Sequence, residues 1–248
     1  MTGLPDLRVG TSGWHYPHWV GPFYPPGTRP DRFLGLYTRH FGSAEINNTF
    51  YRLPTPAAVA GWREATPPGF LFAAKGSRFI THMKKLKDPA EGLRRYLEPL
   101  ALLGDKLGPV VFQLPPRWRL DLGRLAAFLG MLPDGRRFAF EFRDQSWFAP
   151  ETYRLLERHG AALCLWDLAG RRSPALVTAD FAYVRLHGPG GPYQGSYGEE
   201  ALAAWAERML AWRAAGIAAY CYFDNDDRGH APADALRLAR LVGCAPPA

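Results

Sequence analysis

Short apolar runs with the length and aromatic content of strands alternate along this chain with longer segments of helical periodicity. The runs predict strands at 8–14, 44–50, 70–75, 109–115, 137–143, 161–167, 182–187 and 218–225. The periodic segments predict helices at 32–41, 56–65, 89–103, 121–131, 151–159, 199–215 and 231–242. Only a weak element follows the sixth strand, and Asp88 before Pro89 predicts an N-cap for the third helix.

Eight strands alternating with helices predict an α/β fold, a single (β/α)₈ TIM-like barrel domain spanning residues 1–248. The competing fold is a doubly wound open sheet, which usually carries a glycine-rich phosphate loop after its first strand. The segment 10–13 is too short for that loop and lacks its third glycine. No linker or charge block marks a domain boundary, so the barrel is the prediction.

The fifth predicted strand shows where chemistry would lie. Side chains alternate between the two faces of a strand, so Phe138, Phe140 and Phe142 share one face. Glu141 and Arg143 share the other. Polar groups that face the inside of a closed sheet at its strand ends form the active sites of barrels. We therefore expect Glu141 and Arg143 at the C-terminal mouth.

The same alternation places polar groups inside on most other strands. The predicted inner set on these strands is Glu45, Asn47, Lys75, Gln113, Asp167, Arg185 and His187, and on strand eight either Asp224 or Asn225. Such a set is too polar to bury without a ligand, water or metal to offset desolvation. It is therefore the candidate site, although single members have structural interpretations, such as an ion pair between Glu141 and Arg143.

Roles follow from side-chain chemistry. The catalytic candidates are Glu45, Glu141 and His187, and the substrate-binding candidates are Trp14, Asn47, Lys75, Gln113, Arg143, Trp147, Arg185, Tyr197 and Asn225. Lys75, Arg143 and Arg185 suit a phosphate or carboxylate, which arginine binds with two parallel hydrogen bonds. A nearby cation would keep Glu141 ionised and burial would oppose this, so the sequence leaves its pKa open.

Several motifs resemble one family along the whole chain. They are Gly10-Thr-Ser-Gly-Trp14, Glu45-Ile-Asn-Asn-Thr-Phe-Tyr51, Thr81-His82, Gln113-Leu-Pro-Pro116, Glu141-Phe-Arg143 with Ser146-Trp147, Val184-Arg-Leu-His-Gly188 and Tyr222-Phe-Asp-Asn-Asp226. In this order they resemble the YecE-like family, domain of unknown function seventy-two. The resemblance implies one TIM-like barrel and assigns no biochemical role.

Charge and loops add a second hypothesis. The formal charge is +7, and four of the five lysines (75, 84, 85 and 87) fall in one short segment. The loop 76–88 would lie at the mouth, and so would 188–197, whose glycines suggest a lid. The first hypothesis is an enzyme using acid–base chemistry on a phosphorylated or other anionic substrate, with hydrolysis and isomerisation both open. The second is a nucleic-acid-binding or nucleic-acid-processing protein that uses the basic loop, and the third is a non-catalytic scaffold.

Cofactors and location are bounded by what the sequence contains. Too few histidines fall at strand ends for a three-zinc site, whereas a single Mg²⁺ or Mn²⁺ on Glu45, Glu141 or Asp224 stays open. No P-loop, nucleophile elbow or dinucleotide fingerprint is present. Three cysteines without metal or redox spacing, and no signal pattern or membrane-length apolar run, predict a cytoplasmic protein.

Overall fold

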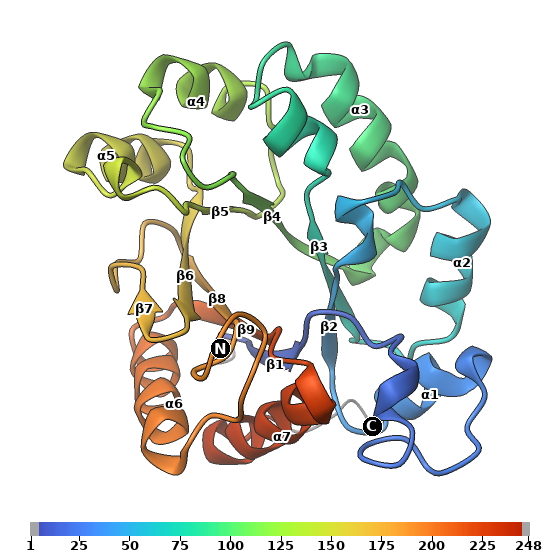
Figure 1. Cartoon of the computed structure of the whole chain (residues 1–248). Helices are drawn as coiled ribbons and strands as arrows, with labels where there is room; N and C mark the ends of the chain where they lie inside the picture. Colours follow the sequence, from blue (N-terminus) through green and yellow to red (C-terminus); the bar gives the residue numbers. More distant parts are fainter. Residues whose placement is uncertain (1–4, 245–248) are drawn as a thin grey trace.

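A ring of parallel strands surrounded by helices forms the centre of the molecule (Figure 1). The computed structural model describes residues 5–244. Its strands are β1 (Leu7–Thr11), β2 (Ser43–Ile46), β3 (Leu71–Lys75), β4 (Leu107–Gln113), β5 (Phe138–Glu141), β6 (Ala162–Leu168), β7 (Arg171–Arg172), β8 (Phe181–Leu186) and β9 (Ala218–Phe223). Their order is β1-β9-β8-β6-β5-β4-β3-β2, with the short β7 antiparallel to β6. The predicted α/β fold, a TIM-like barrel of eight parallel strands, is confirmed.

Helices cover the outside of this ring. They are α1 (Phe33–Tyr37), α2 (Pro56–Glu64), α3 (Pro89–Leu100), α4 (Leu122–Leu129), α5 (Pro150–Arg158), α6 (Glu199–Ala214) and α7 (His230–Val242). The short helical turns are η1 (Pro17–Trp19), η2 (Pro30–Arg32), η3 (Asn48–Phe50), η4 (Phe79–Met83), η5 (Ala101–Lys106), η6 (Gln145–Trp147) and η7 (Asp227–Gly229). No helix among residues 5–244 is long and apolar enough to cross a membrane.

The barrel is nearly closed, with a seam between β1 and β2. At the C-terminal end of the seam the backbone N–H of Gly13 donates to the carbonyl of Glu45 at 2.8 Å. Further down, the Tyr37 hydroxyl from α1 accepts from the backbone N–H of Thr11 at 2.9 Å and donates to the carbonyl of Ser43 at 3.0 Å. A helix side chain therefore supplies hydrogen bonds that a ladder between the two strands would otherwise make.

Gly10 permits this close approach, and its replacement tests the seam. A Cβ atom at Gly10 would collide with the Ser43 carbonyl and the Tyr37 hydroxyl. We expect Gly10→Ala to lower the free energy of unfolding by about 1–3 kcal/mol, as overpacking does elsewhere. The control is Gly35→Ala in α1, where a Cβ meets nothing within 4 Å. Urea unfolding should separate the two, and equal stabilities would show that the seam tolerates a side chain.

Small and large residues fill the barrel interior together. The inner cluster contains Ala73, Val111, Ala139, Ala162, Cys164, Phe181, Tyr183, Ala218, Tyr220 and Tyr222. Alanines on β3, β5 and β6 leave room for the aromatic rings of β8 and β9, so the ring of strands is packed rather than hollow. Phe138, Phe140 and Phe142 belong to the outer core beneath the helices, as their parity predicts.

Several predicted boundaries differ, for local reasons. The second strand ends at Ile46 because the Thr49 hydroxyl donates to the carbonyls of Ile46 and Lys75, which curls 48–50 into η3. The helix predicted at 32–41 is regular only over α1, and the one at 89–103 ends at Leu100 and continues as η5. Asp88 occupies the N-cap position, but its left-handed backbone leaves its side chain without a capping hydrogen bond.

The parity predicted for the sixth strand is wrong. Cys164 faces the interior, so Asp167, an odd number of positions away, faces outward. There its Oδ2 accepts from Arg172 Nε at 2.7 Å. The apolar run offered no contrast between its two faces, because both are buried in a closed barrel.

Candidate functional site

Arg185 on β8 lies at the centre of a buried cluster of charges. Its guanidinium donates to Glu45 Oε1 at 2.8 Å, to Glu141 Oε2 at 2.8 Å and to Asp224 Oδ2 at 3.1 Å. Burial lowers the pKa of Arg185, but the three carboxylates outweigh it and raise that pKa well above its ordinary value. Arg185 is therefore a permanent cation whose hydrogen-bonding capacity is directed at the protein.

The carboxylate of Glu45 on β2 is likewise hydrogen-bonded to other residues of the protein. Besides Arg185, its carboxylate accepts from the Tyr183 hydroxyl at 2.6 Å and from the Ser12 hydroxyl. Glu45 is fully buried, and its oxygens point at these donors rather than toward the mouth. Glu45 and Arg185 thus hold the strands together from within, and a ligand would displace existing hydrogen bonds to reach them.

The two carboxylate oxygens of Glu141, at the end of β5, have different partners. Oε2 accepts from Arg185, whereas Oε1 forms an ion pair with Arg143 Nη2 and lies 3.3 Å from His187 Nε2. No described residue donates a well-aligned hydrogen bond to Oε1. Burial raises the pKa of Glu141, but Arg143 and then Arg185 hold it well below its ordinary value of 4.5. Glu141 is therefore ionised and suited to accept a proton rather than to donate one.

His187 has its tautomer assigned by its partners. Its Nε2 lies 2.7 Å from Arg143 Nη2, and its Nδ1 lies 3.0 Å from Asp224 Oδ2. Arginine only donates, so Nε2 must accept and Nδ1 carries the proton that Asp224 accepts. Burial raises the pKa of Asp224, but Arg185 and His187 keep it below its ordinary value. Tyr193 covers the imidazole edge-on, with ring centroids 5.8 Å apart.

Lys75 at the end of β3 has no such partners. It is only 5 % exposed, yet its ammonium makes no ion pair or hydrogen bond with the residues that the structure describes. Its Nζ lies 4.6 Å from the centroid of the Phe50 ring. Burial, followed by the charge of Arg185, lowers the pKa of Lys75 to about 8, against an opposing effect of Asp224, Glu141 and Glu45.

A cavity opens beside the cluster at the C-terminal ends of β1 and β2. It has a volume of about 200 Å³, and its lining includes Trp14, Tyr16, Asn47 and Tyr51. Tyr16 closes the inner side by donating to the carbonyl of Ser12 at 2.8 Å. The buried Oδ1 of Asn47 accepts no hydrogen bond from the described part of the chain. The cavity suits a small polar ligand.

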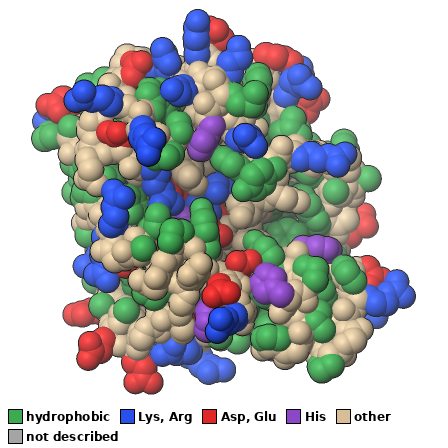
Figure 2. Space-filling model, in the orientation of Figure 1, with side chains coloured by type: hydrophobic (Ala, Val, Ile, Leu, Met, Phe, Trp, Pro, Cys, Tyr) green, Lys and Arg blue, Asp and Glu red, His purple; other side chains and the backbone are tan. Residues whose placement is uncertain are grey.

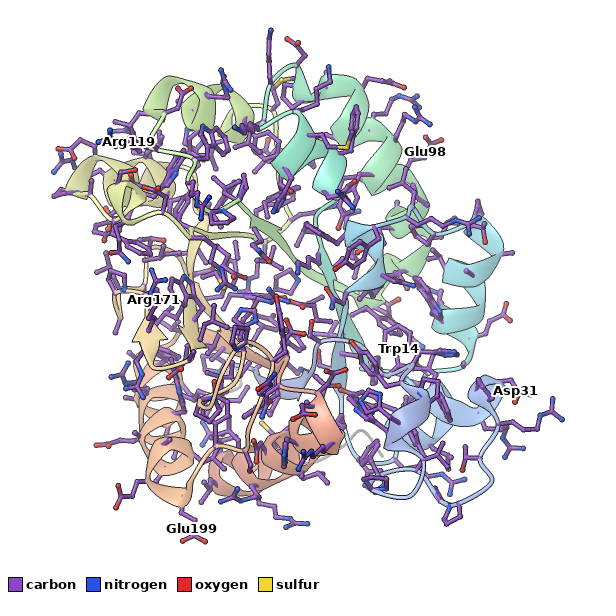
Figure 3. All side chains as sticks on the ribbon, in the orientation of Figure 1. Trp14, Asp31, Glu98, Arg119, Arg171 and Glu199 are labelled. Carbon is purple, nitrogen blue, oxygen red and sulfur yellow. The ribbon has the colours of Figure 1, made fainter. Side chains whose placement is uncertain are left out.

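Trp14 forms a wall of this cavity rather than a platform within the barrel. It packs edge-on against Trp62 of α2 at 5.7 Å and against Phe72 at 5.5 Å, and Figure 3 shows it between the barrel and the helical layer. Gln113 lies closer to the cluster, with Oε1 3.4 Å from Arg185 Nη1. Gln113 therefore borders the charged cluster, whereas Trp14 lines the cavity.

Trp147 lies apart from the cluster, in the helical layer. Its ring stacks on Phe142 with centroids 4.8 Å apart, and its indole N–H donates to the carbonyl of Trp118 at 2.6 Å. Because Phe142 has outward parity, the ring stacked on it is also outside the barrel.

Tyr197 and Asn225 anchor the loop 188–197 rather than face the mouth. The Tyr197 hydroxyl accepts from the N–H of Gly188 at 3.0 Å, and Asn225 Nδ2 donates to the carbonyl of Gly195 at 2.8 Å. Asp234 accepts from both the backbone of Tyr197 and the Asn225 amide. Asp224, not Asn225, is the inward residue of the eighth barrel strand.

Three supporting residues were absent from the sequence prediction. Ser12 and Tyr183 bond to Glu45, and Trp166 lies 4.7 Å from the Arg143 guanidinium, which stacks over its ring. The parity of Ser12 with Gly10, and of Tyr183 with Arg185, would have revealed the first two. Trp166 shares the parity of Cys164, so the wrong assignment of β6 concealed it.

The carboxylates are arranged around Arg185 and not around a common vacant point. Within residues 5–244, no group of three or more His, Cys, Asp or Glu side chains is placed to hold a metal ion. The geometry thus gives no support to the single Mg²⁺ or Mn²⁺ considered from the sequence.

The lysine-rich segment lies on the surface near the mouth. It contains η4, a turn of π-helix, followed by exposed Lys84, Lys85 and Lys87. Figure 2 shows Lys and Arg side chains most densely on the half of this face that carries α3, α4 and α5. Tyr51, Phe79 and Met83 are exposed beside them at 68 %, 45 % and 66 %.

Comparisons with known proteins agree with this architecture. The model of the family described as "Protein of unknown function DUF72" matches residues 8–248. The chain belongs to the DUF72 family. It is 26% identical to the UPF0759 protein YecE of Escherichia coli, over 91% of this chain and 89% of that protein. It is 23% identical to the UPF0759 protein YunF of Bacillus subtilis, over 95% and 94% of the two chains. The predicted family is confirmed.

Solved structures of DUF72 proteins share the barrel. The crystal structure of TM1631 from Thermotoga maritima superposes with a TM-score of 0.85 and 29% identity, covering 96% of this chain and 99% of that one. A structure of EF0366 from Enterococcus faecalis gives 0.83 at 19% identity, with 96% and 95% covered, and shows the fold alone. None of these names states a substrate, so the function has to be argued from the site.

Proposed function

We propose that this DUF72 barrel is an enzyme that binds a small anionic substrate at its C-terminal mouth and transfers a proton to or from it. The observation that carries the proposal is Glu141 Oε1, a fully buried carboxylate oxygen without a well-aligned donor, beside Arg143. A structural ion pair is normally completed by further hydrogen bonds, because burying an unsatisfied charge is costly. A carboxylate oxygen that stays ionised at the mouth can accept a proton from a bound substrate, and its low pKa lets it return that proton readily.

The surrounding residues take separate roles in this proposal. Arg143 and Lys75 are the cations that can still donate hydrogen bonds to an anion, because Arg185 already donates to three carboxylates. Glu141 accepts the proton, and the Asp224–His187 pair holds Arg143 in place through Nε2. Hydrolysis and isomerisation can both use such a proton transfer, which contributes typically 10²–10⁴-fold to a rate.

Inorganic phosphate tests the anion site directly. We expect phosphate to raise the melting temperature, because a ligand at 100 times its Kd adds about 2.7 kcal/mol to the stability of the folded state. Arg143→Gln should abolish this shift, since it removes the guanidinium that binds the anion. The control is Arg94→Gln on α3, where the exposed Arg94 pairs with Glu91 and Glu98. A phosphate shift that persists in Arg143→Gln would place the anion elsewhere.

A second candidate function rests on a different observation. A groove of about 440 Å³ beside η4 has Tyr51, Phe79, Lys84 and Arg95 among its lining residues. Exposed aromatic rings next to cations are the elements with which single-stranded nucleic acids are bound without sequence preference. This surface is separate from the charged cluster, so the two functions are tested by different variants.

Salt dependence tests the nucleic-acid candidate. For a single-stranded oligonucleotide, log K falls against log salt with a slope of about −0.7 per phosphate contacted. Replacing Lys84, Lys85 and Lys87 by glutamine should flatten the slope by about 2 units if all three contact phosphates. The matched control replaces the exposed arginines 154, 158 and 208, which lie on α5 and α6. Binding that ignores both salt and the three lysines would exclude the loop.

A further inference from the structure

Lys75 differs from the other buried lysine of this chain. Lys106 is 9 % exposed, and its ammonium donates to the carbonyls of Arg63 and Thr66 and to the Thr66 hydroxyl, which explains its burial. Lys75 is 5 % exposed, and no described residue accepts a hydrogen bond from it. Its packing is nevertheless well defined, because Thr49 donates to its carbonyl at 2.7 Å and places Phe50 over Nζ. The fold thus holds an unpaired amine in a defined place.

That place is the floor of the mouth. Lys75 is the last residue of β3 and has the interior parity of Leu71 and Ala73. Ala73, two positions earlier on the same face, pairs with Glu45 in the sheet, so Lys75 lies beyond this pair at the strand end. The Phe50 ring beneath its amine also contacts His82, with ring centroids 5.0 Å apart. A molecule entering the mouth would therefore meet this amine.

Burial also changes what the amine can do. A lysine with a pKa of about 8 has roughly a quarter of its amine neutral at about pH 7.5, against roughly one in a thousand for an ordinary lysine. Neutral amines attack carbonyl carbon, and desolvation in an apolar setting is one way in which proteins activate lysine for this reaction.

We propose that Lys75 is a nucleophile that forms an imine with the carbonyl carbon of an anionic aldehyde or keto acid. This names a substrate class for the proposed function and rests on it. Arg143 would bind the carboxylate or phosphate group of the substrate, and Lys75 would bind its carbonyl. Glu141 Oε1 would then remove a proton from the carbon next to the iminium, whose positive charge acidifies that carbon.

Formation of the imine needs no cofactor. The lone pair of Nζ forms the C–N bond while the carbonyl π pair moves to oxygen, and one proton passes from nitrogen to oxygen to give a carbinolamine. A second proton, from solvent at the mouth, joins the hydroxyl. The C–O bond then breaks and water leaves, which forms the protonated imine. Hydrolysis reverses these steps and releases the product.

Reductive trapping tests the proposal. The probe is glyoxylate with cyanoborohydride at about pH 7.5, which converts an imine into a stable carboxymethyl amine. The chain has only five lysines, so peptide mass mapping follows each of them. We expect Lys75 to be labelled at least about tenfold faster than Lys84, Lys85 and Lys87, with a pH midpoint near 8 instead of near 10.4. Inorganic phosphate should slow the labelling of Lys75 and leave the other lysines unaffected.

Each outcome decides between the two proposals. Labelling of Lys75 no faster than that of the surface lysines, or unaffected by phosphate, would overturn the nucleophile. If phosphate still raises the melting temperature through Arg143, the acid–base site survives that failure. If Lys75 is labelled selectively but phosphate binding does not depend on Arg143, the anion site fails instead. Lys75→Arg, which keeps the charge and lacks the reactive amine, should lose the label at this position.

Discussion

Arg185→Met should lower the free energy of unfolding by at least about 3–5 kcal/mol at neutral pH, the usual cost of removing one partner from a buried ion pair. The methionine is similar in length, so the loss reflects charge more than volume. Three buried carboxylates, Glu45, Glu141 and Asp224, would lose the cation that now contacts each of them. Urea unfolding at neutral pH measures the effect.

The pH dependence of stability should also differ between the natural chain and the Arg185→Met variant. In the natural chain the pKa values of Glu141 and Asp224 are held below 4.5 and 3.8, so their contribution to stability is present above those values and is lost as pH falls. Without Arg185, Glu141 keeps Arg143 beside it and Asp224 keeps its contact with His187, so the lowering of both pKa values is weakened. The folded variant then gains less stability than the natural chain as pH rises through the carboxylate range. The difference in stability between the two proteins should therefore be larger near about pH 7 than near about pH 4.

The control for this pH dependence is Arg94→Met, which removes an exposed partner of Glu91 and Glu98. It should unfold like the natural chain at both pH values. An Arg185→Met protein that is as stable as the natural chain, or whose loss of stability is the same at both pH values, would show that the carboxylates do not depend on Arg185.

Glu141→Gln should leave the barrel folded, bind phosphate at least as well as the natural chain, and reduce turnover by about 10²–10⁴-fold once a substrate is in hand. The amide keeps the shape of the side chain and can still accept from Arg185 Nη1, which now lies 2.8 Å from Oε2. It loses the negative charge beside Arg143, so an incoming anion meets a more positive mouth.

Thermal melts with and without phosphate separate catalysis from structure here. If Glu141 serves only as a partner of Arg143 and Arg185, the variant should melt much lower, and phosphate should not restore it. That result would remove Glu141 as the base. Glu91→Gln is the control, because Glu91 is an exposed residue of α3 whose partner is Arg94. It should change neither the melting temperature nor the phosphate shift appreciably.

The sequence alone determined the barrel and the inward face of most of its strands. Strand parity is a local property, since a side chain two positions along always returns to the same face. That is why Glu141, Arg143, Arg185 and His187 could be placed together at the mouth from alternation alone. Alternation gave the wrong answer for β6, where both faces are apolar and Asp167 was assigned to the wrong face.

Tertiary structure decided which of the inward groups have ion-pair or hydrogen-bond partners within the described part of the chain and which do not. Arg185 and Glu45 are 140 residues apart, and only closure of the barrel brings them into contact at 2.8 Å. The same closure leaves Lys75 without a hydrogen-bond partner among residues 5–244, although its sequence environment resembles that of any strand-end lysine. Loop residues were decided there too, because Trp147 and Tyr197 follow no strand periodicity and Asn225 lies beyond the end of β9. Their positions depend on packing with distant segments, and local alternation carries no information about such contacts.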